Sequence, residues 1–292
     1  MSISIPDLVG VRARHPEAIA EAAGRRARRP LVGDSGRLMI IAADHPARGA
    51  LAVGDRQLAM ANRFDLLERL TLALSRPRVD GVLATADILE DLLLLGALEG
   101  RIAMGSMNRG GLAGAAFELD DRFTGHRAQD LARLGFDAGK LLLRIDYEDA
   151  GSLTTMHSTA RAVDEMAAHR LPVFVEPFLT RRHGGRVSND LGAEAVTKSI
   201  AIASGLAGTS AYTWLKVPVT RDPDDMARVM ETSTLPAVLL GGEVDGDQDV
   251  TFEKWRTALR LPTVQGLVVG RSLLYPSGGD VGQAVDTAAG LL

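Results

Sequence analysis

Residues 211–219 read Ala-Tyr-Thr-Trp-Leu-Lys-Val-Pro-Val, an apolar, aromatic and β-branched run that is typical of a buried β-strand. Lys216 lies in this run, where a strand covered on both faces ordinarily carries no charge. Lysine is scarce in the chain: the others are Lys140, Lys198 and Lys254, and Lys140 also lies in an apolar run. Unlike arginine, a desolvated lysine can lose its proton and form an imine with a carbonyl. Two hypotheses stand open for Lys216: an imine-forming residue, or a lysine that pairs with a buried carboxylate or reaches to solvent.

Seven other apolar runs of strand length occur, and most are separated by segments of helix length. The strands are expected at residues 38–43, 81–84, 102–107, 141–145, 173–175, 212–219, 237–240 and 266–269. The helices are expected at residues 55–75, 86–98, 126–134, 155–169, 191–204, 222–231 and 249–259 and after residue 279. Eight strand and helix units in about 250 residues indicate an α/β fold, a single (β/α)8 TIM barrel. An open, doubly wound sheet is the alternative, although no Gly-x-Gly-x-x-Gly follows the first strand.

The residues before the first strand have a helical pattern of their own. Apolar residues recur with helical spacing from Leu8 to Ala22, and Pro30 and a Gly-Asp-Ser-Gly turn at residues 33–36 end the segment. We therefore predict an N-terminal helical extension at residues 1–36 and a barrel domain at residues 37–292.

The composition argues against several functional classes. A net charge of −4 gives no basic footprint for nucleic acid, and the arginines between residues 25 and 29 are interpreted as a solvated helix face. The apolar runs are too short to span a bilayer. Cysteine is absent, which excludes disulfides, thiol catalysis and thiolate metal ligands. We expect a cytoplasmic protein that binds neither nucleic acid nor membranes and that assembles as a homo-oligomer, as barrels of this kind commonly do.

Polar residues gather at the expected strand ends, where TIM barrels carry their active sites. They are Asp44 and His45 after the first strand, Asn108 and Arg109 after the third, Lys140 and Asp146 on the fourth, Glu176 on the fifth, Lys216 on the sixth and Arg271 after the eighth. Glycines follow the last two strands, at Gly241, Gly242 and Gly270, and their bare amides suit a phosphate group. One such residue can be an ordinary loop residue or ion pair, but two lysines and two carboxylates on four strands indicate a site.

This set of residues suits reversible aldol cleavage through a lysine imine. The attacking lysine must be neutral, and burial or a nearby like charge lowers a lysine pKa from its reference of about 10.4. Lys140 can supply that charge beside Lys216. A carboxylate must then accept the proton of the hydroxyl whose carbon–carbon bond breaks, and Glu176 and Asp44 are the candidates. No metal or other cofactor is expected.

Two other functional classes stay open. A metal-dependent aldolase or isomerase needs two or three histidines at strand ends, whereas only His45 is so placed and His183 falls in a predicted loop. The remaining histidines are expected at the surface: His15, His126, His157 and His169. A catalytically idle barrel that binds a sugar phosphate as a sensor is the second alternative.

Five short motifs carry these residues. They are Ala42-Ala43-Asp44-His45, Gly139-Lys140-Leu141-Leu142-Leu143, Phe174-Val175-Glu176-Pro177, Trp214-Leu215-Lys216-Val217 and Gly266-Leu267-Val268-Val269-Gly270-Arg271. In this order they resemble the site motifs of class I aldolases of the tagatose-bisphosphate and sulfofructose-phosphate type, from about residue 37 to 275. The resemblance implies a TIM barrel in which Lys216 forms the imine, Glu176 transfers the proton and Lys140 and Asp44 support them. It also implies a phosphate cradle at Gly242, Gly270 and Arg271.

The chain departs from these relatives around the substrate. His45 replaces their usual glutamine, and Gly241-Gly242-Glu243 replaces a Ser-Gly turn. The closest likeness is to a barrel branch associated with bacterial inositol catabolism, whose aldolase cleaves 5-dehydro-2-deoxygluconate 6-phosphate. A basic loop at residues 180–186 is expected to face the barrel mouth and hold a second anion, or to be a solvated loop. The residues expected to contact the substrate are His45, Arg109, Arg181, Arg182 and the phosphate cradle.

Overall fold

Eight parallel strands close into a barrel, as the sequence predicts. The structure is a computed structural model that describes residues 3–220, 222–241 and 248–292. The barrel strands are β1 (Leu38–Ala42), β2 (Gly81–Ala84), β3 (Ile102–Ser106), β4 (Ala138–Ile145), β5 (Val173–His183), β7 (Thr213–Val217), β8 (Ala237–Leu240) and β9 (Val264–Val269). They lie in the order β4-β3-β2-β1-β9-β8-β7-β5, and the pairing of β4 with β5 closes the ring. The prediction of a (β/α)8 TIM barrel is confirmed.

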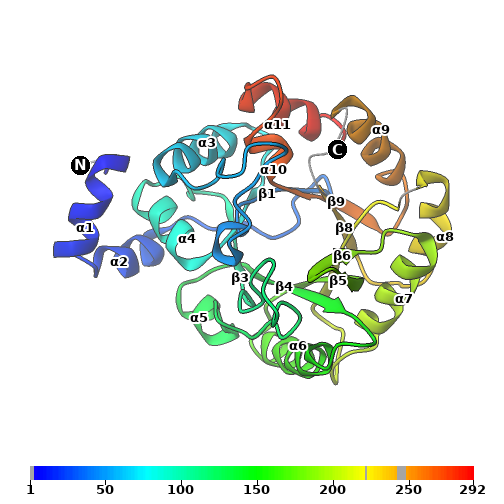
Figure 1. Cartoon of the computed structure of the whole chain (residues 1–292). Coiled ribbons are helices and arrows are strands. Elements are labelled where there is room, and N and C mark those ends of the chain that lie inside the picture. The colour runs from blue at the N-terminus through cyan, green and yellow to red at the C-terminus, as the bar shows by residue number, and fades with distance from the viewer. Residues whose placement is uncertain (1–2, 221, 242–247) are drawn as a thin grey trace.

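Helices surround the barrel in chain order, with the strands inside them (Figure 1). They are α3 (Arg63–Ser75), α4 (Ala86–Leu94), α5 (Ala128–Arg133), α6 (Gly151–Ala168), α7 (Ala193–Ser204), α8 (Met226–Met230), α9 (Gln248–Ala258), α10 (Arg271–Leu274) and α11 (Val281–Ala289). The larger apolar cluster packs between this ring and the outward faces of the strands. A smaller one fills the barrel interior with inward side chains such as Ile40, Met104, Phe174 and Val268. Alternate residues of a strand point to opposite faces, so each barrel strand contributes to both clusters.

The N-terminal segment forms two helices, α1 (Leu8–Arg14) and α2 (Ala18–Arg25). α2 packs against α4, at the outer edge of the ring in Figure 1. Just after α2, the buried guanidinium of Arg26 donates to an Asp137 carboxylate oxygen at 2.9 Å and to two backbone carbonyls. Asp137 also accepts from the amide of Ala103 on β3, so this arginine ties the segment to the barrel. The domain boundary at residue 36 stays a prediction.

The prediction of a loop after the fifth strand is wrong. β5 instead continues to His183, turns at Gly184 and Gly185, and pairs antiparallel with β6 (Arg186–Asn189). Both glycines have positive φ, of 54° and 80°, which is the backbone conformation that a two-residue hairpin turn requires. The basic residues of this segment therefore lie on a β-hairpin.

The first long helix begins later than predicted, at Arg63 rather than near residue 55. Asn62 caps it, because its side-chain oxygen accepts from the amides of Phe64 and Asp65. Among the described residues, no helix has the length and apolar character needed to cross a membrane.

Candidate active site

Two lysines and a glutamate meet inside the barrel. Glu176 on β5 contacts the ammonium of Lys216 on β7 through one carboxylate oxygen and that of Lys140 on β4 through the other. The exposed fractions of these residues are 7% for Glu176, 6% for Lys216 and 2% for Lys140. One buried carboxylate thus bridges two ammonium groups.

Strand register explains why residues so distant in sequence meet. On β4, Lys140 lies beside Ser106 of β3, and Leu142 lies beside Glu176 of β5. On β7, Leu215 pairs with Val175, which places the next residues of the two strands, Lys216 and Glu176, at the same level. Because β4, β5 and β7 are parallel neighbours, their inward-facing residues converge. The structure thus brings these three predicted residues together, and their catalytic roles stay predictions.

Asp44, directly after β1, forms a second buried centre next to Lys140. Its Oδ2 atom accepts from the Nζ of Lys140 at 3.3 Å, from the Oγ of Ser106 at 3.0 Å and from the Nη2 of Arg109. The Nε of Arg109 in turn donates to Ser106 Oγ at 2.6 Å. Lys140 therefore stands between two carboxylates, Glu176 and Asp44.

The carboxylates of the site are held in their charged form. Burial raises the pKa of Glu176, but the charges of Lys140 and Lys216 outweigh it and lower that pKa to about 2. Burial also raises the pKa of Asp44, yet Arg109 and then Lys140 bring it well below its ordinary value. At neutral pH both side chains are therefore anions.

Burial, followed by the charge of Arg109, lowers the pKa of Lys140 to about 8. A group of this kind exchanges protons readily near neutral pH. Three cations, Lys140, Lys216 and Arg109, face two carboxylates, so the site carries an excess of one positive charge.

His45 borders the site on the side of β9. Its Nδ1 lies 3.9 Å from Asp44 Oδ1, and burial, together with the charge of Arg271, lowers its pKa to about 3 despite the opposing effect of Asp44. The ring is therefore neutral at pH 7. A Cβ atom added to Gly270 would lie 2.1 Å from the carbonyl oxygen of Ala42 and 3.2 Å from the His45 ring. Glycine at position 270 is what allows β1 and β9 to approach here.

Three of the four residues predicted to bind the phosphate lie within the part of the chain that the structure describes. Gly241 and Gly270 follow the paired strands β8 and β9, and Arg271 begins α10 directly after Gly270. The Nη1 of Arg271 donates to the carbonyl of Ala52 at 3.5 Å. Gly242 lies outside the described residues.

Three other arginines predicted to contact substrate take different positions. Arg109 is buried and bound to Asp44 and Ser106. Arg182 donates to the carbonyls of Ala115 and Ala116 and pairs with Asp149 at 3.3 Å, so it fastens the hairpin to neighbouring segments. Arg181, on the opposite face of the hairpin, is exposed. Their roles in binding stay predictions.

Sequence reasoning missed two polar side chains of this region. Ser106 carries a hydroxyl between Asp44 and Arg109, and its inward position two residues before Asn108 was the available indication. The surface location predicted for His126 is wrong, because its ring is buried and packs edge-on against Phe136 with centroids 5.6 Å apart. Among residues 3–220, 222–241 and 248–292, no three histidine, aspartate or glutamate side chains converge as metal ligands.

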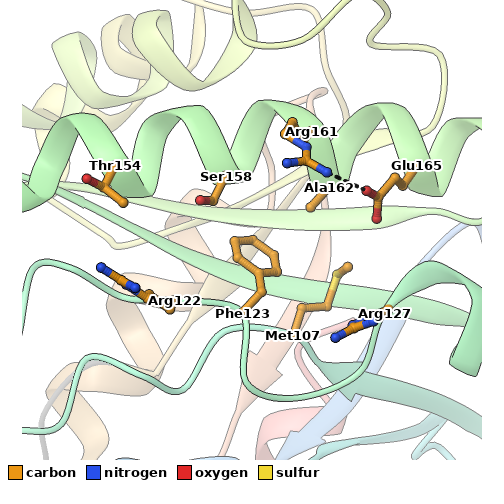
Figure 2. Close-up of a pocket in the computed structure, with 9 residues that line it drawn as sticks. All are labelled: Met107, Arg122, Phe123, Arg127, Thr154, Ser158, Arg161, Ala162 and Glu165. Atoms are coloured by element: carbon orange, nitrogen blue, oxygen red, sulfur yellow. Dashed lines mark ion pairs between the residues drawn. The ribbon is translucent and has the colours of Figure 1, made fainter.

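A groove of about 640 Å³ lies elsewhere, on the outer wall of the barrel between α6 and the segment around Phe123. Figure 2 shows Thr154, Ser158 and Arg161 along one face of α6, opposite the Phe123 ring. Two of its three arginines already have carboxylate partners: Arg161 pairs with Glu165, as the dashed line marks, and Arg122 pairs with Asp120. The buried lysines and carboxylates do not line this groove, so the site inside the barrel is the candidate for chemistry.

Comparisons with known proteins agree with this architecture. The crystal structure of Cgl0159 from Corynebacterium glutamicum is 53% identical, with a TM-score of 0.95 over 99% of this chain and 97% of that one. A Schiff-base-forming fructose-1,6-bisphosphate aldolase is 18% identical, with a TM-score of 0.65 over 94% of this chain and 99% of that one. An archaeal fructose 1,6-bisphosphate aldolase is also 18% identical, with a TM-score of 0.66 over 94% and 98%. At such identity the two aldolases share the fold with this chain.

The sequence comparisons define the family. No curated protein sequence matches the chain. A model of the Cgl0159-like proteins matches residues 36–289, which is nearly all of the barrel. The chain therefore belongs to the Cgl0159-like family.

Proposed function

We propose that this protein is a class I aldolase, an aldehyde-lyase that cleaves a phosphorylated keto-sugar or keto-sugar acid through a lysine imine. One observation carries the proposal: the carboxylate of Glu176 contacts the ammonium groups of both Lys216 and Lys140 inside a barrel. The fold likeness to Schiff-base aldolases supports it. A purely structural ion pair needs one lysine for one carboxylate, whereas a second buried lysine costs desolvation energy that a catalytic role explains.

Lys216 is the proposed nucleophile. As a neutral amine, its Nζ adds to the ketone carbon, and loss of water from the carbinolamine leaves an iminium. Glu176 contacts Lys216 directly and is placed to take the ammonium proton and to return a proton to the departing hydroxyl. Because the pKa of Glu176 is only about 2, a proton on it passes on quickly, and Lys140, with a pKa of about 8, is the group suited to exchange it.

Cleavage then needs a base at the β-hydroxyl, which lies two carbons from the imine carbon. A carboxylate accepts that proton, the carbon–carbon bond breaks, and its electron pair moves to the iminium to give an enamine and a free aldehyde. Asp44 and Glu176 are the two candidates, since both are ionised and lie on either side of Lys140. Protonation of the enamine carbon and hydrolysis release dihydroxyacetone phosphate and restore Lys216.

The anionic end of the substrate is proposed to lie by β8 and β9. Gly241 and Gly270 directly follow these strands, and Arg271 comes directly after Gly270. The excess positive charge of the buried cluster also favours an anionic substrate over a neutral sugar. His45, neutral and beside Gly270, is placed to hydrogen-bond a substrate hydroxyl.

Within this class, we infer 5-dehydro-2-deoxygluconate 6-phosphate of inositol catabolism as the first substrate to test. The resemblance described for the motifs supports it. Tagatose 1,6-bisphosphate and 6-deoxy-6-sulfofructose 1-phosphate are the alternatives, because the same lysine and carboxylates serve any of these ketose phosphates. Incubation of the purified protein with each compound, with release of triose phosphate measured by a coupled dehydrogenase, tests the proposal. Cleavage of one compound supports it, and no release from any of the three favours a non-catalytic sugar-phosphate-binding barrel.

A further inference from the structure

The hydrogen bonds around Asp44 are unevenly distributed between its two carboxylate oxygens. Three donors converge on Oδ2: the hydroxyl of Ser106, the guanidinium of Arg109 and the ammonium of Lys140. Oδ1 accepts no hydrogen bond from the described part of the chain and lies 3.9 Å from the neutral ring of His45. The carboxylate is thus fixed through one oxygen while the other keeps its lone pairs.

Ser106 and Arg109 form a single unit with a defined direction of hydrogen bonding. Arg109 Nε donates to Ser106 Oγ at 2.6 Å, so the hydroxyl proton of Ser106 must point away from Arg109 and toward Asp44 Oδ2, 3.0 Å away. Both side chains are buried, with exposed fractions of 0% for Ser106 and 6% for Arg109. A buried guanidinium that donates hydrogen bonds to two partners, Ser106 and Asp44, is held in one orientation.

Arg109 also competes with Lys140 for the same carboxylate. Without Arg109, Lys140 would be the nearest cation to Asp44 and would be drawn toward it from Glu176, which lies on its other side. With Arg109 in place, Lys140 contacts Asp44 at the longer distance of 3.3 Å and keeps its closer contact with Glu176.

We propose that Arg109, oriented by Ser106, is a positioning residue of this site: it holds Asp44 through Oδ2, directs Oδ1 to the substrate, and keeps Lys140 on Glu176. The proposal rests on the aldolase function proposed above for the use of the site, but its physical content concerns Lys140 and Asp44 alone. It gives Arg109 a role other than contact with the substrate.

The charged groups that face Lys140 decide how this can be measured. They are Asp44 after β1, Arg109 after β3, Glu176 on β5 and Lys216 on β7. Arg109 is the largest charge contribution that lowers the pKa of Lys140, after burial. Removal of the Arg109 charge should therefore raise that pKa, whereas a residue that merely anchors the loop after β3 would leave it unchanged.

Stability against pH gives a readout that needs no substrate. With a folded pKa of about 8 and an ordinary value of 10.5, Lys140 binds a proton in the unfolded chain but not in the folded one between these values. Stability contributed by Lys140 therefore rises with pH across this window. In Arg109→Gln the folded pKa of Lys140 should be higher than in the wild type. The rise in stability should therefore start at a pH that is higher by about 1.

The experiment is urea unfolding of the full chain from pH 7 to 10.5 for wild type, Arg109→Gln and Arg109→Lys. Arg122→Gln is the matched control, because Arg122 lies in the same loop but is exposed and pairs with Asp120 outside the site. We expect the curve of unfolding free energy against pH to shift upward in pH only in Arg109→Gln. In Arg109→Lys, which keeps the charge, the curve should lie closer to that of the wild type. An Arg109→Gln profile that runs parallel to that of Arg122→Gln would overturn the proposal.

Turnover separates this inference from the proposed function. If wild type cleaves a ketose phosphate, the pH dependence of kcat/KM should show the limb near pH 8 moving upward in Arg109→Gln and staying in place in the control Arg122→Gln, whose arginine pairs with Asp120 outside the site. No cleavage by wild type refutes the aldolase, while the unfolding profiles still decide on Arg109. If Arg109→Gln fails to fold, the Arg109→Gln and Asp44→Asn double variant removes both charges and should fold. Because the charge of Asp44 raises the pKa of Lys140, the double variant is compared with Asp44→Asn alone. The rise in stability should start at a higher pH in the double variant than in Asp44→Asn, and identical profiles would contradict the proposal.

Discussion

Replacement of Glu176 by glutamine removes the charge that two buried lysines share, and the structure gives the size of the effect. A pKa of about 2 against an ordinary 4.5 corresponds to about 3 kcal/mol in favour of the ionised carboxylate. A glutamine amide also presents an N–H donor to one ammonium, where the carboxylate presented an acceptor. We therefore expect Glu176→Gln to unfold about 3–5 kcal/mol more easily at pH 7, the range for removing one partner of a buried ion pair.

The loss of stability in Glu176→Gln should become smaller as the pH rises. Glu176 holds protons on the lysines, so without it the pKa of Lys140 falls below about 8 and the folded protein sheds that buried charge more easily. Urea unfolding at pH 7 and pH 9.5 should show a smaller difference from wild type at the higher pH. Triose phosphate release by the variant should fall by about 10²- to 10⁴-fold, since the proposed proton-transfer group is gone.

The control for this change is Glu194→Gln on α7. Glu194 is exposed and pairs with Lys198 one helical turn away, so its replacement should leave stability and turnover nearly unchanged. Wild-type stability and turnover in Glu176→Gln would refute the bridging role that we assign to this carboxylate.

Three further changes test the neighbouring groups. Lys140→Met should slow turnover by about 10²-fold or more near neutral pH. The change removes both a like charge beside the nucleophile and a group that exchanges protons near pH 8. A variant that keeps the wild-type pH profile of turnover would contradict this. Arg271→Ala should raise KM for phosphorylated substrates by about 10- to 100-fold but leave unphosphorylated analogues almost unaffected, and an equal loss for both would make Arg271 structural. Asp44→Asn should lower kcat and also lower the pKa of Lys140, because the charge of Asp44 raises that pKa in the wild type. The limb of the pH profile should therefore move below 8, and an unmoved limb would show that Asp44 does not act on Lys140 in this way.

The barrel was predictable because each strand is an uninterrupted apolar run between helical segments. The runs around Ile40, Leu215 and Val268 are buried on both faces, and parallel strands of this kind leave a clear trace in composition. The hairpin formed by the end of β5 and β6 has no comparable apolar pattern in the sequence. Its residues, including Arg181 and His183, are mostly exposed, so neither face selects apolar side chains, and the adjacent glycines at 184 and 185 were the only indication of a turn.

The site was predictable as a set of residues and not as a network. Charges within apolar strands singled out Lys140, Glu176 and Lys216 as candidates, because an ionised residue in such a place needs a partner. The sequence does not specify which partner each charge has. Arg109 lies next to polar residues in a loop, and its contact with Asp44 depends on the folded positions of two segments that are far apart in the sequence. The burial of His126 likewise follows from packing around Phe136 that no local pattern encodes.

Reduction of a trapped imine tests the central claim most directly. Wild type and Lys216→Arg are incubated with the ketose phosphate that the wild type cleaves, or with dihydroxyacetone phosphate. The proteins are then reduced with borohydride, digested and analysed by mass spectrometry. The Arg variant keeps a cation beside Glu176 but cannot form an imine. The account predicts one covalent adduct, on Lys216 of the wild type, and none in the variant. An adduct on Lys140, or turnover by Lys216→Arg comparable to that of wild type, would contradict it.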